Sequence, residues 1–214
     1  MQNIVSAVVQ KLLWTLLVCT LSGCAVPAGA SGDDSSAGMP SITSSASKDG
    51  ACALISDLYG RHFGNICARG TASFTMHSLD GVSVDWPAAE AKDVCVLYVL
   101  GGKGVQEGSA IIYPETAFLP QGLDLEAAAS RLAPFSTPAQ YSNRDGLLFA
   151  LRFLDEPVDE LFPIQVKAYC AHNDALLILT LAARSHKNLQ EHLPTLHTLM
   201  DYVTVGDLKI VPDF

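Results

Sequence analysis

This 214-residue chain has an apolar run near its N-terminus, followed by small residues and a cysteine. The run separates a leader from the part of the chain that is expected to fold. Lys11 precedes apolar residues 12–19, a stretch shorter than the about 20 residues that span a hydrocarbon core. This anatomy, with Ser22 and Gly23 before Cys24, is typical of a cleaved secretory leader. The alternative is an uncleaved membrane helix over residues 4–21. We expect residues 1–23 to be removed and the rest to fold outside the cytoplasm.

The four residues Leu21-Ser22-Gly23-Cys24 resemble the lipobox of bacterial lipoproteins. In that family the cysteine carries diacylglycerol as a thioether and becomes the new N-terminus. The resemblance implies cleavage before Cys24, lipidation of its sulfur, and membrane attachment in which each buried methylene adds about 0.8 kcal/mol. Ala25 stands where Asp resembles the inner-membrane retention signal of enteric bacteria. By that analogy the protein is expected on the periplasmic face of the outer membrane.

The stretch after the lipidated cysteine is predicted to be a flexible tether over residues 24–48. It is rich in Ser, Gly and Ala, and so little apolar surface cannot repay the entropy of ordering the chain. A flexible chain of about 24 residues has a root-mean-square span of roughly 25–30 Å. The alternative is a first strand at Ile42-Thr43. The remaining residues, 49–214, are expected to form one globular domain.

The charge balance argues against a nucleic-acid partner. The chain carries 13 basic and 22 acidic side chains, and loss of Lys11 with the leader takes the net charge from −9 to −10. Such a surface repels phosphate backbones and anionic lipid headgroups. The densest acidic run, residues 155–160, has oxygen ligands that suit calcium, but it is more typical of a solvated turn.

Cysteine usage agrees with export. With Cys19 in the leader and Cys24 lipidated, four cysteines remain for the domain: Cys52, Cys67, Cys95 and Cys170. Four cysteines allow three pairings, of which we favour Cys52–Cys67 with Cys95–Cys170, because a short loop at the domain entry closes easily. The competing interpretation makes Cys95 and Cys170 buried thiols. The spacings fit neither a zinc site nor a C-x-x-C motif, and no cofactor is expected.

Hydrophobic periodicity predicts helices and strands in mixed order. A first helix, with apolar residues at helical spacing over 51–58, is expected to begin after Ser47 or Asp49 and to end at Gly60 or Gly64. Further helices are expected over residues 124–132 and around residues 189–203, where Pro194 requires a kink or a restart. Asp80-Gly81 is predicted to be a hairpin turn, and so is His172-Asn173-Asp174. The predicted strands cover residues 71–77, 82–84, 94–100, 109–113, 147–154, 164–170 and 175–183.

This order predicts an α+β domain with an antiparallel sheet and helices packed mainly on one face. The closing unit, strand 175–180 running through Ala182-Ala183 into helix 193–200, resembles the end of PsbP-like domains. That resemblance implies a non-catalytic binding or assembly module. The early Pro-Asp-Gly-Trp-like turn of the family is only echoed by Leu79-Asp80-Gly81-Val82, with Trp86-Pro87 later. No functional residue is therefore carried over.

Signals for catalysis are weak. Gly101-Gly102-Lys103-Gly104 lacks the spacing of a phosphate-binding loop and reads as a hairpin turn. Cys170 and His172 alternate on a predicted strand and would share a face, which suits an activated thiol or two metal ligands. Since His172 borders a turn and Cys170 has a possible sulfur partner, a structural role is favoured. The histidines of the last helix are spaced too widely to share one face: His186, His192 and His197.

Two functions of different classes follow. The favoured one is a lipid-anchored envelope protein that binds an envelope protein or a small ligand without catalysis. The alternative is a periplasmic hydrolase-like enzyme that uses Cys170 and His172, or a carboxylate pair such as Asp155 and Glu160.

Overall fold

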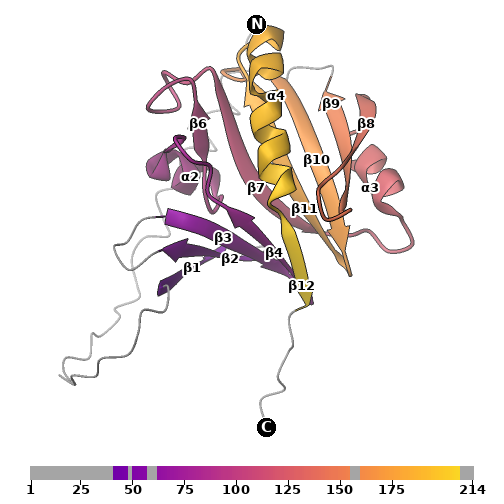
Figure 1. Cartoon of the computed structure of the whole chain (residues 1–214). Coiled ribbons are helices and arrows are strands. Elements are labelled where there is room, and N and C mark those ends of the chain that lie inside the picture. The colour runs from indigo at the N-terminus through magenta and orange to yellow at the C-terminus, as the bar shows by residue number, and fades with distance from the viewer. Residues whose placement is uncertain (1–40, 48–49, 57–61, 155–159, 208–214) are drawn as a thin grey trace, which may run out of the picture. The chain divides into compact units, whose positions relative to one another are not determined.

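The computed structural model describes residues 41–47, 50–56, 62–154 and 160–207, with side chains from residue 64 onward (Figure 1). The described part belongs to one compact unit that begins at Gly38. The leader, the lipobox and Cys24 lie outside the described residues, and so does Asp155.

The N-terminal part of the domain forms a five-stranded antiparallel sheet. Its spatial order is β1 (Ser41–Ser47), β2 (Gly50–Ser56), β3 (His62–Arg69), β4 (Ala72–His77) and β12 (Thr204–Asp207). The predicted helix over residues 51–58 is wrong, because this apolar stretch is short enough to fit either structure and pairs with β1 and β3 as a strand. The predicted tether is also too long, since β1 occupies residues 41–47, where the alternative placed a strand.

The second sheet has seven antiparallel strands. Its spatial order is β5 (Ser83–Val84), β6 (Tyr98–Leu100), β7 (Ala110–Phe118), β11 (Ala175–Ala183), β10 (Ile164–His172), β9 (Leu148–Leu154) and β8 (Ser136–Ser142). The predicted strands over residues 147–154, 164–170 and 175–183 are confirmed to within a few residues. The hairpin between β10 and β11 is confirmed as well.

Two connections differ from expectation. Asp80-Gly81 does not close a hairpin, because β4 and β5 belong to different sheets. The strand expected over residues 94–100 is ordered as β6 only from Tyr98, and it lies one place from the sheet edge rather than at its centre. Its three residues are nonetheless buried on both faces, as the continuous apolar run predicted.

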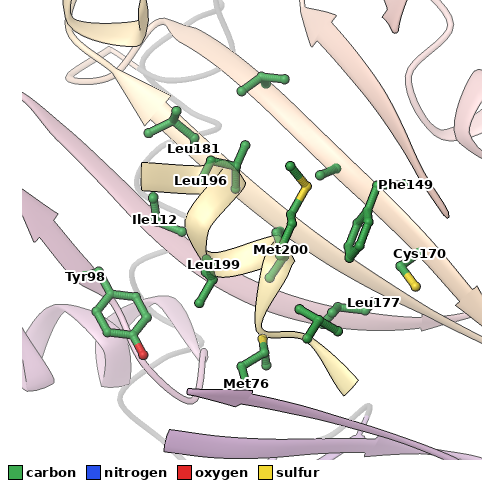
Figure 2. Packing of buried hydrophobic residues seen from close by; sticks show 14 of the residues in the cluster. Met76, Tyr98, Ile112, Phe149, Cys170, Leu177, Leu181, Leu196, Leu199 and Met200 are labelled. Carbon is green, nitrogen blue, oxygen red and sulfur yellow. The ribbon is translucent and has the colours of Figure 1, made fainter. Parts of the chain in front are cut away.

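The main core lies between one face of the seven-stranded sheet and two covering layers. Figure 2 shows Leu196, Leu199 and Met200 of α4 (His186–Asp201) packing against this face. Alternate side chains of β11 meet them, among them Leu177 and Leu181. Strands β3 and β4 add buried side chains to the same cluster, so the five-stranded sheet and α4 cover one face together.

Two shorter helices lie against the opposite face. α2 (Trp86–Lys92) contributes Ala89 to a cluster with the outward side chains of β6 and β7, and α3 (Leu125–Leu132) contributes Ala129 to a second one. The α+β class with antiparallel sheets is confirmed. The helices divide between the two faces, however, rather than gathering on one, because the outward side chains of the central strands are also apolar and need covering.

Candidate functional site

A cleft of about 670 Å³ opens between the end of β4 and the C-terminal half of α4. The segment that leads from β4 toward β5 forms one wall, and the helix forms the other. The cleft is lined by nine residues: His77, Ser78, Leu79, Asp80, Val82, Pro194, Thr195, Thr198 and Tyr202. Its volume falls within the range of about 300–1,000 Å³ that small-ligand sites occupy.

Asn143 fixes the end of the helical wall. This side chain is buried, and its Nδ2 donates to the carbonyls of Met200 at 3.2 Å and Val203 at 3.3 Å, which lie at and just beyond the C-terminus of α4. Its Oδ1 accepts from the backbone amides of Asp145 and Leu147. One side-chain amide therefore binds the last carbonyls of the helix and locks the adjoining turn onto it.

The helix continues through Pro194 without interruption, although a proline removes one backbone hydrogen bond. Thr198 Oγ1 donates to the carbonyl of Pro194 at 3.0 Å, one turn back along the helix. Both residues line the cleft.

Tyr202 forms the aromatic end of the cleft. Its ring is 45% exposed and meets the imidazole of His77 edge to face, with the ring centroids 6.0 Å apart. The guanidinium of Arg144 lies 5.5 Å from the centroid of the same ring, while its Nε lies 3.3 Å from Asp201 Oδ2. These contacts hold the tyrosine ring in place at the rim.

A second aromatic pair supports the helix behind the rim. Tyr141 of β8 stacks on His197 with centroids 4.6 Å apart, and its hydroxyl donates to Asp201 Oδ1 at 2.7 Å. The hydrogen bond to this carboxylate raises the pKa of Tyr141. Asp201 therefore accepts from β8 and from Arg144 at once, which ties the end of α4 to the edge of the sheet.

The cleft offers both polar and apolar groups to a ligand. Ser78 and Thr195 supply hydroxyls, Asp80 supplies a carboxylate, and Leu79 and Val82 supply apolar surface. Sequence reasoning missed this cleft, because its two walls lie more than 100 residues apart and neither carries a motif.

The suspected pair Cys170 and His172 does not form a reactive site. Cys170 is fully buried in the main core, and burial raises the pKa of its thiol to about 12. His172 lies with its Nε2 2.8 Å from Asp207 Oδ1, a carboxylate that also accepts from Asn173. The thiol is thus neutral and enclosed, while the imidazole links the β10–β11 hairpin to β12.

A serine–histidine contact was not foreseen from the sequence. Ser109 Oγ lies 2.8 Å from His192 Nε2, and the same oxygen donates to the carbonyl of Leu100 at 3.1 Å. The serine oxygen thus lies between a ring nitrogen of α4 and a backbone carbonyl at the end of β6. This pair joins α4 to the β6–β7 connection.

The glycine-rich segment Gly101-Gly102-Lys103-Gly104 lies in the connection between β6 and β7, as expected of a hairpin. Arg184 Nε donates to the carbonyl of Gly108 at 2.6 Å, and its Nη2 donates to Val105 at 3.2 Å. The loop therefore turns carbonyl oxygens toward a guanidinium, the opposite of the amide cradle that binds phosphate.

The cysteine pairing differs from the favoured one. Cys170 carries a free thiol, so the Cys95–Cys170 bond is not formed, and Cys95 takes part in another disulfide. Cys67 is also a thiol, which accepts from Asn65 Nδ2 at 3.7 Å, so the structure does not form the Cys52–Cys67 bond. Cys52 lies opposite Cys67 in the β2–β3 register, but its side chain lies outside those described.

Two features were sought in the part of the chain that the structure describes: a cluster of metal ligands and a membrane-spanning helix. Among residues 41–47, 50–56, 62–154 and 160–207, no three His, Cys, Asp or Glu side chains gather in a way that would hold a metal ion. Within the same ranges, no helix is both long and apolar enough to cross a bilayer. Glu160 is exposed at the start of the last of these ranges.

Comparison of the chain with protein-family models, with curated proteins and with solved structures finds no match.

Proposed function

We propose that this protein is a lipid-anchored component of the cell envelope that binds a small ligand in the cleft between β4 and α4, without catalysis. In this proposal Cys24 carries the acyl chains, and the domain stands on the periplasmic face of the outer membrane. The lipobox-like sequence supports the anchor, and the PsbP-like closing unit supports a binding role.

The lining of the cleft is the main support for ligand binding. Its walls combine hydroxyls, one carboxylate and a held aromatic ring with apolar side chains, a mixture suited to a ligand with both polar groups and an apolar surface. The suspected pair Cys170 and His172 gives no support to catalysis, because Cys170 is enclosed in the main core with a neutral thiol.

The anchor is tested by the mass of the protein extracted from native envelopes with detergent. We expect a chain that begins at an acylated Cys24. A Cys24→Ser variant is expected to keep residues 1–23 and to carry no acyl mass, whereas Cys19→Ser, a matched change inside the leader, should still be processed. A wild-type chain that starts at Met1 without acyl groups would contradict the proposed anchor.

The cleft is tested by a photo-cross-linking amino acid placed at Thr198, an exposed residue of its helical wall. The matched control places the same group at Lys187, which is exposed on the same helix but does not line the cleft. We expect irradiated cells to give an adduct of small mass at position 198 only. A protein-sized adduct would indicate an envelope protein as occupant, and equal labelling at both positions would count against a cleft-specific ligand.

A further inference from the structure

The cysteines outside the cleft indicate a covalent link within the domain. Cys95 takes part in a disulfide. Cys170 and Cys67 both carry thiols, and Cys67 has its own contact with the amide of Asn65. Neither of these two is therefore the partner of Cys95.

The remaining candidates for the partner of Cys95 are Cys19, Cys24 and Cys52. The choice among them rests on the proposed function. If the leader is cleaved, Cys19 is lost, and if Cys24 is lipidated, its sulfur is already bonded to carbon. We propose that Cys95 forms a disulfide with Cys52, the cysteine that remains in the mature chain. The domain would then hold one disulfide and two thiols, Cys67 and Cys170, instead of the two disulfides expected from the sequence.

The strand register supports this pairing. Residue 52 lies directly opposite Cys67 in the antiparallel pair of β2 and β3, and opposite positions in such a pair share one face of the sheet. Cys67 belongs to the main core cluster, and Cys95, half-buried just before β6, packs against that same cluster. The bond would join the five-stranded sheet to the segment that leads into the seven-stranded one.

The competing partner for residue 52 is Cys67. Directly opposed residues have Cα atoms about 4.5–5.5 Å apart, a separation that a disulfide can bridge. Cys67 is deeply buried, however, and this burial raises the pKa of its thiol to about 12. Since the thiolate is the form that reacts, half-buried Cys95 is the better competitor for a bond.

The chemistry balances with a disulfide donor of the envelope as the oxidant. One of the two thiolates, Cys52 or Cys95, attacks the donor disulfide and forms a mixed disulfide with it. The other thiolate then attacks this protein's sulfur in the mixed disulfide and releases the donor. Two thiol protons and two electrons leave the protein, and the donor departs as a dithiol.

The sequence allows a direct test, because trypsin separates the four cysteines. Cleavage after Lys and Arg gives residues 49–61 with Cys52, residues 62–69 with Cys67, residues 93–103 with Cys95, and residues 168–184 with Cys170. The full lipoprotein is extracted from envelopes, denatured without reductant in the presence of an alkylating reagent, digested and analysed by mass spectrometry.

We expect peptide 49–61 to be linked to peptide 93–103, with Cys67 and Cys170 fully alkylated, and we expect reduction to abolish the linked species. Cys52→Ser should leave Cys95 open to alkylation, whereas the matched change Cys67→Ser should keep the link. A link between peptides 49–61 and 62–69, or alkylation of all four cysteines, would overturn the inference. The N-terminal peptide of the same digest reports separately on the anchor, so the two proposals can fail independently.

Discussion

Arg152 of β9 and Glu126 of α3 form an ion pair on the outward face of the seven-stranded sheet, with the arginine side chain 2% exposed and the glutamate 39% exposed. The guanidinium also donates to the Leu151 carbonyl at 2.9 Å, to the Glu126 carbonyl at 3.1 Å and to Ser130 Oγ at 3.0 Å. A buried charge is tolerated because every contact of the group is a hydrogen bond acceptor. This one side chain attaches the first turns of α3 to the sheet.

Replacement of Arg152 is expected to destabilise the domain. Arg152→Met should lower the free energy of unfolding by about 2–3 kcal/mol, because charge-assisted hydrogen bonds in a nearly dry site are lost while the methionine only partly fills the space. The control is Arg144→Met, an exposed arginine paired with Asp201, for which we expect a loss below about 1 kcal/mol. Urea unfolding of both variants measures the difference, and equal losses would show that burial of Arg152 adds nothing.

The same ion pair is expected to make the free energy of unfolding depend on pH in acid. The hydrogen bond from Arg152, followed by that from Gln140, lowers the pKa of Glu126 from its usual 4.5. A carboxyl whose pKa is lowered by folding stabilises the protein above its unfolded pKa, and this stability is lost as the pH falls through the folded pKa. We expect unfolding free energy to decline below about pH 4.5, with a shallower decline in Glu126→Gln. An unchanged acid profile in that variant would contradict the assignment.

The buried thiols predict a loss of stability in alkali. Burial raises the pKa of Cys170 from 9.0 to about 12, so the native state keeps a proton that the unfolded chain releases above pH 9. The contribution of such a thiol to the free energy of unfolding is fully present below pH 9. It falls by about 1.4 kcal/mol per pH unit up to about pH 12. Cys170→Ala should reduce the slope of unfolding free energy against pH by that amount. Fast unfolding at each pH, before thiols oxidise, is the appropriate measurement.

Gly101 is expected to be far less replaceable than Gly122. Both have positive φ, +71° and +76°, but an added Cβ at Gly101 would lie 2.2 Å from Ser109 Oγ, whereas nothing lies within 4 Å of one at Gly122. Gly122→Ala should cost about 1 kcal/mol from backbone strain alone. Gly101→Ala should cost clearly more, and adding Ser109→Gly should recover part of the excess. Equal costs in a thermal unfolding comparison would rule out the steric contact.

Long, continuous apolar runs were the easiest part of the fold to predict. β11 and its hairpin with β10 follow from residues 164–183, because a buried central strand needs apolar side chains on both faces. The helix capped by Asp124 was equally clear, since Asp124 Oδ1 accepts from the amide of Ala127 as an N-cap should.

Short or distant elements were not predictable from local pattern. Residues 50–56 are as apolar as a helix face, and only their pairing with β3 makes them a strand. β12 has four residues and no strong signal of its own. The cleft depends on His77 meeting Tyr202, a contact that spans most of the domain in sequence, and the role of Arg152 depends on a helix laid over it. Such contacts are set by tertiary packing, which a single sequence does not display.

The pairing of β4 with β12 also constrains when this domain can be completed. Ser73 Oγ donates to the carbonyl of Gly206 at 3.1 Å, across 133 residues of chain. Because this contact closes a very long loop of chain, we expect it to form late in folding, after the β10–β11 hairpin.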